Sequence, residues 1–184
     1  MNKAIVIYES EFGATRRIAE AIASGLESHV RTKLWNVREL PLAESAWKPE
    51  PGDLLVVGSP THARSMPRPL TRTTAASWPE KPGSTLTLEP RALANGVREW
   101  LSEVELNDVS VAAFATRATI PRFLSGSAAA AISRLARHRG ARSFTRPRSF
   151  LVQPEGGVTE DEFVAARIWG RALAVKLTTR WEPV

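Results

Sequence analysis

The chain has 184 residues, 43% of them hydrophobic and 24% charged, which is typical of one folded domain with a substantial core. It contains no cysteine, and this excludes disulfides, thiol nucleophiles and cysteine-ligated metal centres. The three histidines, His29, His62 and His138, fit no metal-ligand spacing. The apolar stretches are too short for a membrane span or a signal-peptide core, so we expect a cytoplasmic protein with no membrane partner.

The net charge is +6, from 25 Lys and Arg against 19 Asp and Glu. Such an excess is compatible with an anionic partner, but net charge bears on solubility and non-specific binding rather than on fold. The most basic stretch is residues 134–148, in which Phe144 is the one aromatic residue. It matches no nucleic-acid-binding module, so we interpret it as a solvated helix end and expect no nucleic-acid partner.

Five runs have the length and composition of β-strands. They are residues 4–8, 30–37, 53–58, 109–114 and 143–152. The first, third and fourth are apolar runs typical of strands buried on both faces. The second mixes apolar and charged residues, so we expect it to be more exposed. Pro147 interrupts the last run, which is therefore predicted to be the weakest strand.

Apolar residues spaced three and four apart predict helices between these strands. The predicted helices begin near Thr15, within residues 93–101 around Leu93 and Val97, after an N-cap at Ser127, and at a capping box in residues 159–162. Alternating strands and helices predict an α/β fold, a three-layer α/β/α sandwich with a parallel sheet. Residues 77–90 contain three prolines and a glycine, and we predict an insertion or lid there in a single domain of residues 1–184.

Ligands of an open α/β sheet bind beyond the carboxyl ends of the strands, which directs attention to the loops that follow them. The first loop, residues 9–15, contains Ser10, Gly13 and Thr15 immediately before a helix, whose free N–H groups attract anions. This pattern predicts a phosphate site, although an ordinary turn with Thr15 as the N-cap is the alternative. The glycine patterns of nucleoside triphosphate and dinucleotide sites are absent, so a monophosphate fits better.

The second and third loops, residues 59–64 and 115–117, offer fewer chemical groups. His62 is a candidate ring contact, hydrogen-bond donor or acid, and a solvated loop histidine is the alternative. Arg117 would stabilise negative charge on an anion or an electron-rich ring, and a surface arginine is the alternative.

Residues Ile5–Leu26 resemble the opening of the flavodoxin family, in which a strand ends in an aromatic residue and a Ser/Thr-x-x-Gly-x-Thr loop precedes a helix with Ile-Ala spacing. Residues 57–62 and 114–117 resemble the second and third FMN loops of that family. The resemblance implies a flavodoxin-like five-stranded parallel sheet of order 2-1-3-4-5 and non-covalently bound FMN. It implies that the phosphate is held by Ser10, Phe12, Gly13, Ala14 and Thr15, and that the ring is bordered by Pro60, Thr61, His62 and Ala63 on one side and by Thr116 and Arg117 on the other.

The chain departs from the family in charge and in aromatic residues. Electron-carrying flavodoxins are acidic and enclose the ring between aromatic side chains, whereas the flat side chains near these loops are Phe12, His62 and Phe123. Trp78, in the insertion, is a candidate cover for the ring. Glu9 and Glu11 oppose a phosphate unless their side chains point away.

Two hypotheses remain open at this point. In the first, the protein binds FMN and acts with a redox partner, either as an electron carrier or as a small oxidoreductase. In the second, a flavodoxin-like fold has lost FMN and serves as a non-catalytic binding or interaction module. The acidic first loop and the shortage of aromatic residues motivate the second hypothesis.

Overall fold

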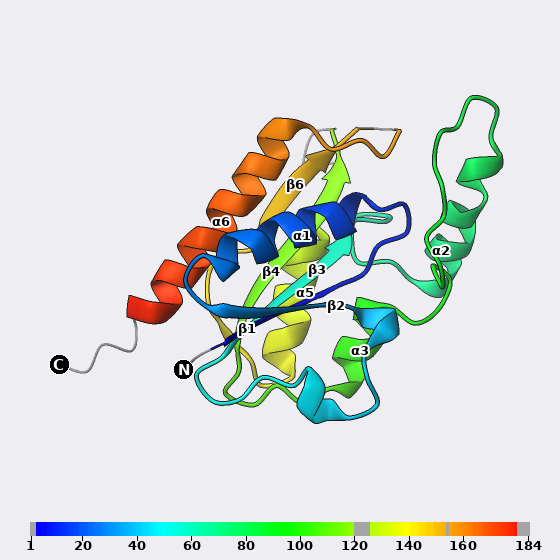
Figure 1. Cartoon of the computed structure of the whole chain (residues 1–184). Helices are drawn as coiled ribbons and strands as arrows, with labels where there is room; N and C mark the ends of the chain where they lie inside the picture. Colours follow the sequence, from blue (N-terminus) through cyan, green and yellow to red (C-terminus); the bar gives the residue numbers. More distant parts are fainter. Residues whose placement is uncertain (1–2, 120–125, 154, 180–184) are drawn as a thin grey trace.

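A computed structural model describes residues 3–119, 126–153 and 155–179 and has a parallel sheet between two layers of helices (Figure 1). The strands are β1 (Lys3–Tyr8), β2 (Arg31–Asn36), β3 (Leu54–Pro60), β4 (Ser110–Ala118), β5 (Arg142–Ser143) and β6 (Arg148–Val152). Their order is β2-β1-β3-β4-β5, and β6 also pairs with β4. The predicted fold class and the predicted order 2-1-3-4-5 are thus confirmed.

The last predicted strand is divided into two, so the sheet has six strands where five were predicted. β5 pairs with the beginning of β4, at Val111 and Ser143, and β6 pairs with its end, at Phe114 and Arg148. Pro147 lies between the two segments, and proline has no N–H group to donate to a sheet. Both segments therefore occupy the fifth position of the fold, one after the other.

Both faces of the central strands β1, β3 and β4 are buried, as their continuous apolar sequences require. Along β1, Ala4, Val6 and Tyr8 point into one hydrophobic cluster, and Ile5 and Ile7 point into the other. The same alternation recurs along β3 and β4. Side chains of successive residues in a strand point to opposite faces, so each strand serves two cores.

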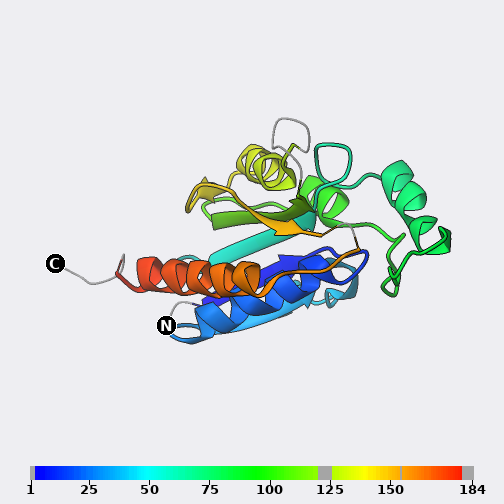
Figure 2. The same ribbon diagram turned by 90° about the horizontal axis from the view of Figure 1, so that it is seen from above.

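In the part of the chain that the structure describes, four helices cover the two faces of the sheet (Figure 2). α1 (Ala14–Glu27) and α6 (Glu160–Thr179) lie on one face, and α3 (Val97–Glu103) and α5 (Ala128–His138) lie on the other. The N-cap prediction is confirmed at Ser127, whose Oγ accepts a hydrogen bond of 3.3 Å from the Ala130 N–H. The prediction that Leu93 belongs to the α3 helix is wrong, because the helix begins at Val97 and Leu93 is exposed.

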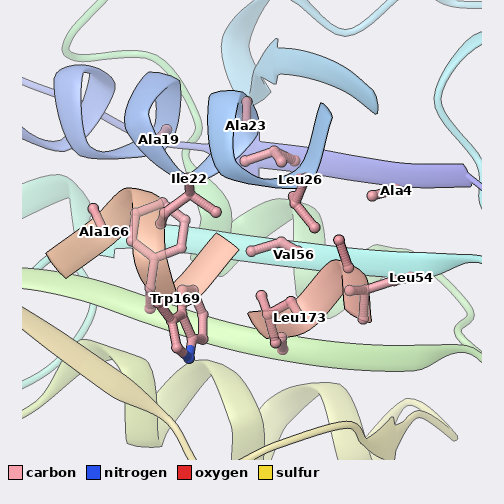
Figure 3. Close-up of a cluster of buried hydrophobic side chains, with 14 of the residues drawn as sticks. Ala4, Ala19, Ile22, Ala23, Leu26, Leu54, Val56, Ala166, Trp169 and Leu173 are labelled. Carbon is pink, nitrogen blue, oxygen red and sulfur yellow. The ribbon is translucent and has the colours of Figure 1, made fainter. Parts of the chain in front are cut away.

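The core beneath α1 and α6 is a continuous apolar contact between the two helices and the sheet (Figure 3). Ile22 and Leu26 of α1 and Trp169 and Leu173 of α6 pack over Val56 of β3. Each fully buried side chain of this kind stabilises the fold by about 1.5–3 kcal/mol. This packing makes the strand ends a rigid platform for the loops that follow them.

The region after β3 contains a helix that the sequence did not predict, α2 (Pro69–Ala76), followed by the short 3₁₀ helix η3 (Trp78–Glu80). Together with the rest of residues 77–90, it projects to one side of the sheet (Figure 1). Among the residues described, no helix has the length and apolar character needed to cross a membrane.

Candidate functional site

A pocket of about 170 Å³ lies at the ends of β1, β3 and β4. It brings together nine of the eleven residues that the resemblance implied: Ser10, Phe12, Ala14, Thr15, Pro60, Thr61, His62, Thr116 and Arg117. Gly13 and Ala63 do not line it. Ala63 is exposed, with a φ of 45° in the turn after β3. The pocket also includes Glu11 of the first loop and residues from outside the three loops, among them Trp78 and Gln153.

Gly13 shapes the first loop through its backbone. Its φ is 86°, a left-handed conformation that favours glycine, and it is the N-cap of α1. The Gly13 N–H donates a 3.0 Å hydrogen bond to Ser10 Oγ, which closes the turn. Thr15 lies inside the first turn of α1, so the alternative that made it the N-cap is wrong.

Backbone and hydroxyl hydrogen bonds join the three loops. Thr15 Oγ1 and Thr116 Oγ1 are 2.7 Å apart, which links the first loop to the third. The Thr61 N–H donates to the Thr116 carbonyl at 2.8 Å, which links the second loop to the third. His62 and Ser65 exchange two backbone hydrogen bonds and hold the second loop in a tight turn. The loops therefore form one connected wall.

Aromatic side chains form one side of the pocket. Trp78 stacks on Phe12 with ring centroids 5.7 Å apart and an interplanar angle of 17°. The His62 ring lies 5.9 Å from Trp78, tilted by 39°. Trp78 thus supplies from the insertion the large aromatic that the three loops lack. Phe123, the other candidate, lies outside the described residues.

Glu9 points away from the first loop and into the body of the protein. It is fully buried, and its Oε1 accepts hydrogen bonds from Arg72 Nε at 2.8 Å and Arg38 Nη2 at 3.1 Å. Its Oε2 accepts from the Val97 N–H at 2.9 Å, at the start of α3. Arg72 also pairs with Glu99 on α3. The negative charge of Glu9 is therefore compensated inside the fold.

Arg38 links the first loop to the segment that contains Ala92 through hydrogen bonds. Its side chain is fully buried and donates to the Ser10 carbonyl at 2.6 Å, to Glu11 Oε1 at 3.0 Å and to the Ala92 carbonyl at 2.7 Å. Sequence reasoning missed Arg38 and Arg72, which lie 29 and 63 residues from Glu9. One signal in the sequence could have pointed to them. Two acidic residues directly after a buried strand need cationic partners if they are buried too.

Glu11 occupies a different position from Glu9, because it also lines the pocket. Burial raises the pKa of Glu11 well above its ordinary value, and the negative charge of Glu9 adds to this rise, while Arg38 opposes it. Glu11 Oε2 lies 3.8 Å from His62 Nε2. Burial lowers the pKa of His62. Burial thus favours the uncharged form of both the carboxyl and the imidazole that faces it.

These strand connections define a flavodoxin-like α/β/α fold, and comparison with solved structures agrees. A flavodoxin from Archaea is 22% identical with a TM-score of 0.59, covering 96% of this chain and 99% of that one. Flavodoxin 1 from Bacillus cereus is 14% identical with a TM-score of 0.63, covering 98% and 100%. The flavodiiron protein from Giardia intestinalis is 17% identical with a TM-score of 0.64, covering 97% of this chain and 37% of that one. At these identities the likeness establishes the flavodoxin-like fold.

Sequence comparison adds one relative. An uncharacterized protein from Methanocaldococcus jannaschii is 35% identical over 66 residues, which are 35% of this chain and 17% of that protein. The match therefore spans about a sixth of the length of that relative. No family model matches the chain.

Proposed function

We propose that this protein binds FMN non-covalently in the pocket at the ends of β1, β3 and β4 and acts in electron transfer or flavin-dependent redox chemistry. The observation that carries the proposal is the convergence of three loops, distant in sequence, with Trp78 on one mostly apolar pocket that has hydroxyl and N–H donors at its base. Apolar walls with a few converging polar groups are typical of cofactor sites.

The residues present suit both ends of the cofactor. The first N–H groups of α1 have no partner within the helix and would donate to a phosphate, with the hydroxyls of Ser10 and Thr15 beside them. Phe12, His62 and Trp78 offer flat surfaces for an aromatic ring. FMN would supply the redox chemistry, and Arg117 would stabilise negative charge on the ring.

The pocket is smaller than the roughly 300–1,000 Å³ of most ligand sites, so the cofactor needs additional room. A second cavity of about 390 Å³ shares Trp78 and Leu86 with the pocket as a common wall. A shift of the segment that carries Trp78 would join the two cavities. Binding would then replace the contact between Phe12 and Trp78 by contacts with the cofactor ring.

The acidic residues of the first loop do not oppose this assignment. Glu9 is bound to Arg38 and Arg72 inside the protein, and burial favours the uncharged form of Glu11. The objection that two negative charges face the phosphate therefore loses its force. This placement favours the FMN-binding hypothesis over a fold that has lost its cofactor.

The test is titration of the purified protein with FMN, followed by quenching of flavin fluorescence. We expect saturable binding that is weakened by Thr15→Ala, which removes the hydroxyl linking α1 to Thr116, and by Gly13→Ala, which strains the loop at its positive φ. Thr178→Ala on α6 and Gly52→Ala, also at a positive φ, lie outside the pocket lining and serve as matched controls.

Three outcomes are distinguishable. Loss of affinity confined to the first pair of variants supports the proposed phosphate position. Equal affinity in all four variants would show that the phosphate lies elsewhere. No binding at high micromolar FMN would refute the proposal and favour the non-catalytic interaction module.

A further inference from the structure

Glu11 and His62 face each other in the wall of the pocket. Glu11 Oε2 is buried and has no hydrogen-bond partner among the described residues. His62 Nε2 lies 3.8 Å from this oxygen. Both side chains are largely buried, and both line the pocket. A polar atom left without a partner in such a place is costly, which indicates that it serves an occupant of the pocket or a proton.

The ionisable groups around the pair have one more carboxyl group than guanidinium groups. Three carboxyl groups (Glu9, Glu11 and Glu99) face two guanidinium groups (Arg38 and Arg72) in one connected network. One proton on a carboxyl group makes this network neutral. Of the three, Glu11 is the natural carrier, because Glu9 accepts three hydrogen bonds and Glu99 is partly exposed.

The hydrogen bonds of Glu11 assign the two oxygens different roles. Oε1 accepts a hydrogen bond from Arg38 Nη2, which would hold the group in place whether it is ionised or not. Oε2 is the atom nearest to His62 and is open to carry the proton. The direction of the pKa of each group agrees with this arrangement, since burial favours the neutral form of both.

We propose that Glu11 and His62 form a proton-holding pair, in which Glu11 Oε2 keeps a proton until negative charge develops beside His62 and then passes it to His62 Nε2. The two atoms first approach from 3.8 Å to hydrogen-bond distance, about 2.6–3.2 Å. The O–H bond of the carboxyl then breaks, an N–H bond forms on the imidazole, and the total charge of the pair is unchanged. The carboxylate left behind is paired with Arg38. The resulting imidazolium lies in the pocket wall and stabilises the incoming charge.

Other groups around the pair also affect the pKa of His62. The charge of Glu9 favours the imidazolium, the charges of Arg72 and Arg38 oppose it, and a hydrogen bond to the backbone of Thr71 favours it. The transfer therefore depends on a charge from outside the network. The identity of that charge rests on the proposed function, in which reduction gives the flavin ring negative charge, whereas the proton on Glu11 is a property of the protein alone.

The first experiment uses the protein without FMN. Infrared spectroscopy at neutral pH is expected to show a carboxylic acid C=O band that shifts in D₂O, disappears in Glu11→Gln and persists in Glu20→Gln, an exposed control on α1. Absence of the band in the parent protein would overturn the proposal.

A second measurement follows the imidazoles of the three histidines by NMR, with His62→Gln to assign one set of signals. Gln has the shape of a protonated Glu and no charge, so Glu11→Gln should change the proton affinity of His62 by less than about threefold. If Glu11 were ionised, removal of its charge would weaken that affinity by about tenfold or more. A loss of that size contradicts the proposal even where the infrared band is ambiguous.

The transfer itself is tested with bound FMN, by infrared difference spectra between the reduced and oxidised protein. We expect the Glu11 band to fall and imidazolium bands to rise, with neither change in Glu11→Gln or His62→Gln. Binding of FMN without these changes overturns the proton transfer and leaves the proposed function intact. Failure to bind FMN removes the transfer together with the proposed function, while the spectra of the protein alone still decide whether Glu11 is protonated.

Discussion

Replacement of Arg38 by methionine tests whether the buried network supports the first loop. Methionine keeps most of the length of the side chain and removes its charge and all its donors. The change deletes hydrogen bonds to the Ser10 carbonyl at 2.6 Å, the Ala92 carbonyl at 2.7 Å, Glu11 at 3.0 Å and Glu9 at 3.1 Å.

The expected loss follows from leaving the buried Glu11 without its guanidinium partner and Glu9 with Arg72 alone. Removal of one partner of a buried ion pair typically costs about 3–5 kcal/mol, because the remaining charge stays desolvated. We therefore expect Arg38→Met to lower the free energy of unfolding by about that amount. Arg142→Met is the matched control, since Arg142 and Asp108 form an exposed ion pair that should contribute about 0–1 kcal/mol.

The loss of stability in Arg38→Met should also depend on pH in a definite direction. Arg38 lowers the pKa of Glu11, so its loss should raise that pKa further in the folded protein. A carboxyl group whose folded pKa is raised costs stability as the pH rises through that pKa, so the deficit of Arg38→Met should be larger at about pH 8 than at about pH 5.

Urea denaturation followed by tryptophan fluorescence at both pH values measures these differences. A deficit below about 1 kcal/mol, or one that grows as the pH falls, would show that the network does not carry the charge balance described here.

Two further predictions concern the pocket wall and β1. Trp78→Ala should weaken FMN binding by about 2- to 12-fold, which corresponds to a stacking contribution of about 0.5–1.5 kcal/mol. It should leave the free energy of unfolding nearly unchanged, because Trp78 lies outside both core clusters. A fluorescence titration that shows equal affinities would contradict the assigned ring position. Burial raises the pKa of Tyr8, the only tyrosine, to about 12. Its ultraviolet titration should therefore be completed well above the usual value of about 10, with stability lost as the pH rises through the folded pKa, whereas titration near 10 in folded protein would show that Tyr8 is not buried.

The fold could be predicted to the extent that local patterns determine it. The continuous apolar runs of β1, β3 and β4 indicated strands buried on both faces, and the structure places alternate residues of each in two cores. Pro147 indicated a weak last strand, but the pattern did not show that the pieces on either side would each pair with β4. α2 was missed because its one large apolar residue, Leu70, is exposed and gives no apolar stripe.

Only the site residues that directly follow a strand could be predicted from the sequence. Residues that directly follow a strand, such as Ser10, Thr61 and Thr116, lie at the pocket because the parallel sheet brings its carboxyl ends to one edge. Trp78 and Arg38 reach the same region from segments whose position no local spacing determines. Their contacts with Phe12 and Glu11 depend on how the insertion and the 3₁₀ helix η1 (Val37–Glu39) pack against the first loop.

The number of acidic residues in a loop does not determine the charge that the loop presents to a ligand. Glu9 and Glu11 show this difference. Counted along the sequence, both residues argue against an anion at the first loop. In the structure, Glu9 is neutralised by arginines beneath the loop, and the buried surroundings of Glu11 favour a proton on its carboxyl. The N-terminus of α1, beside the pocket, then favours an anion. An acidic loop is therefore compatible with an anionic ligand when its carboxylates serve the interior.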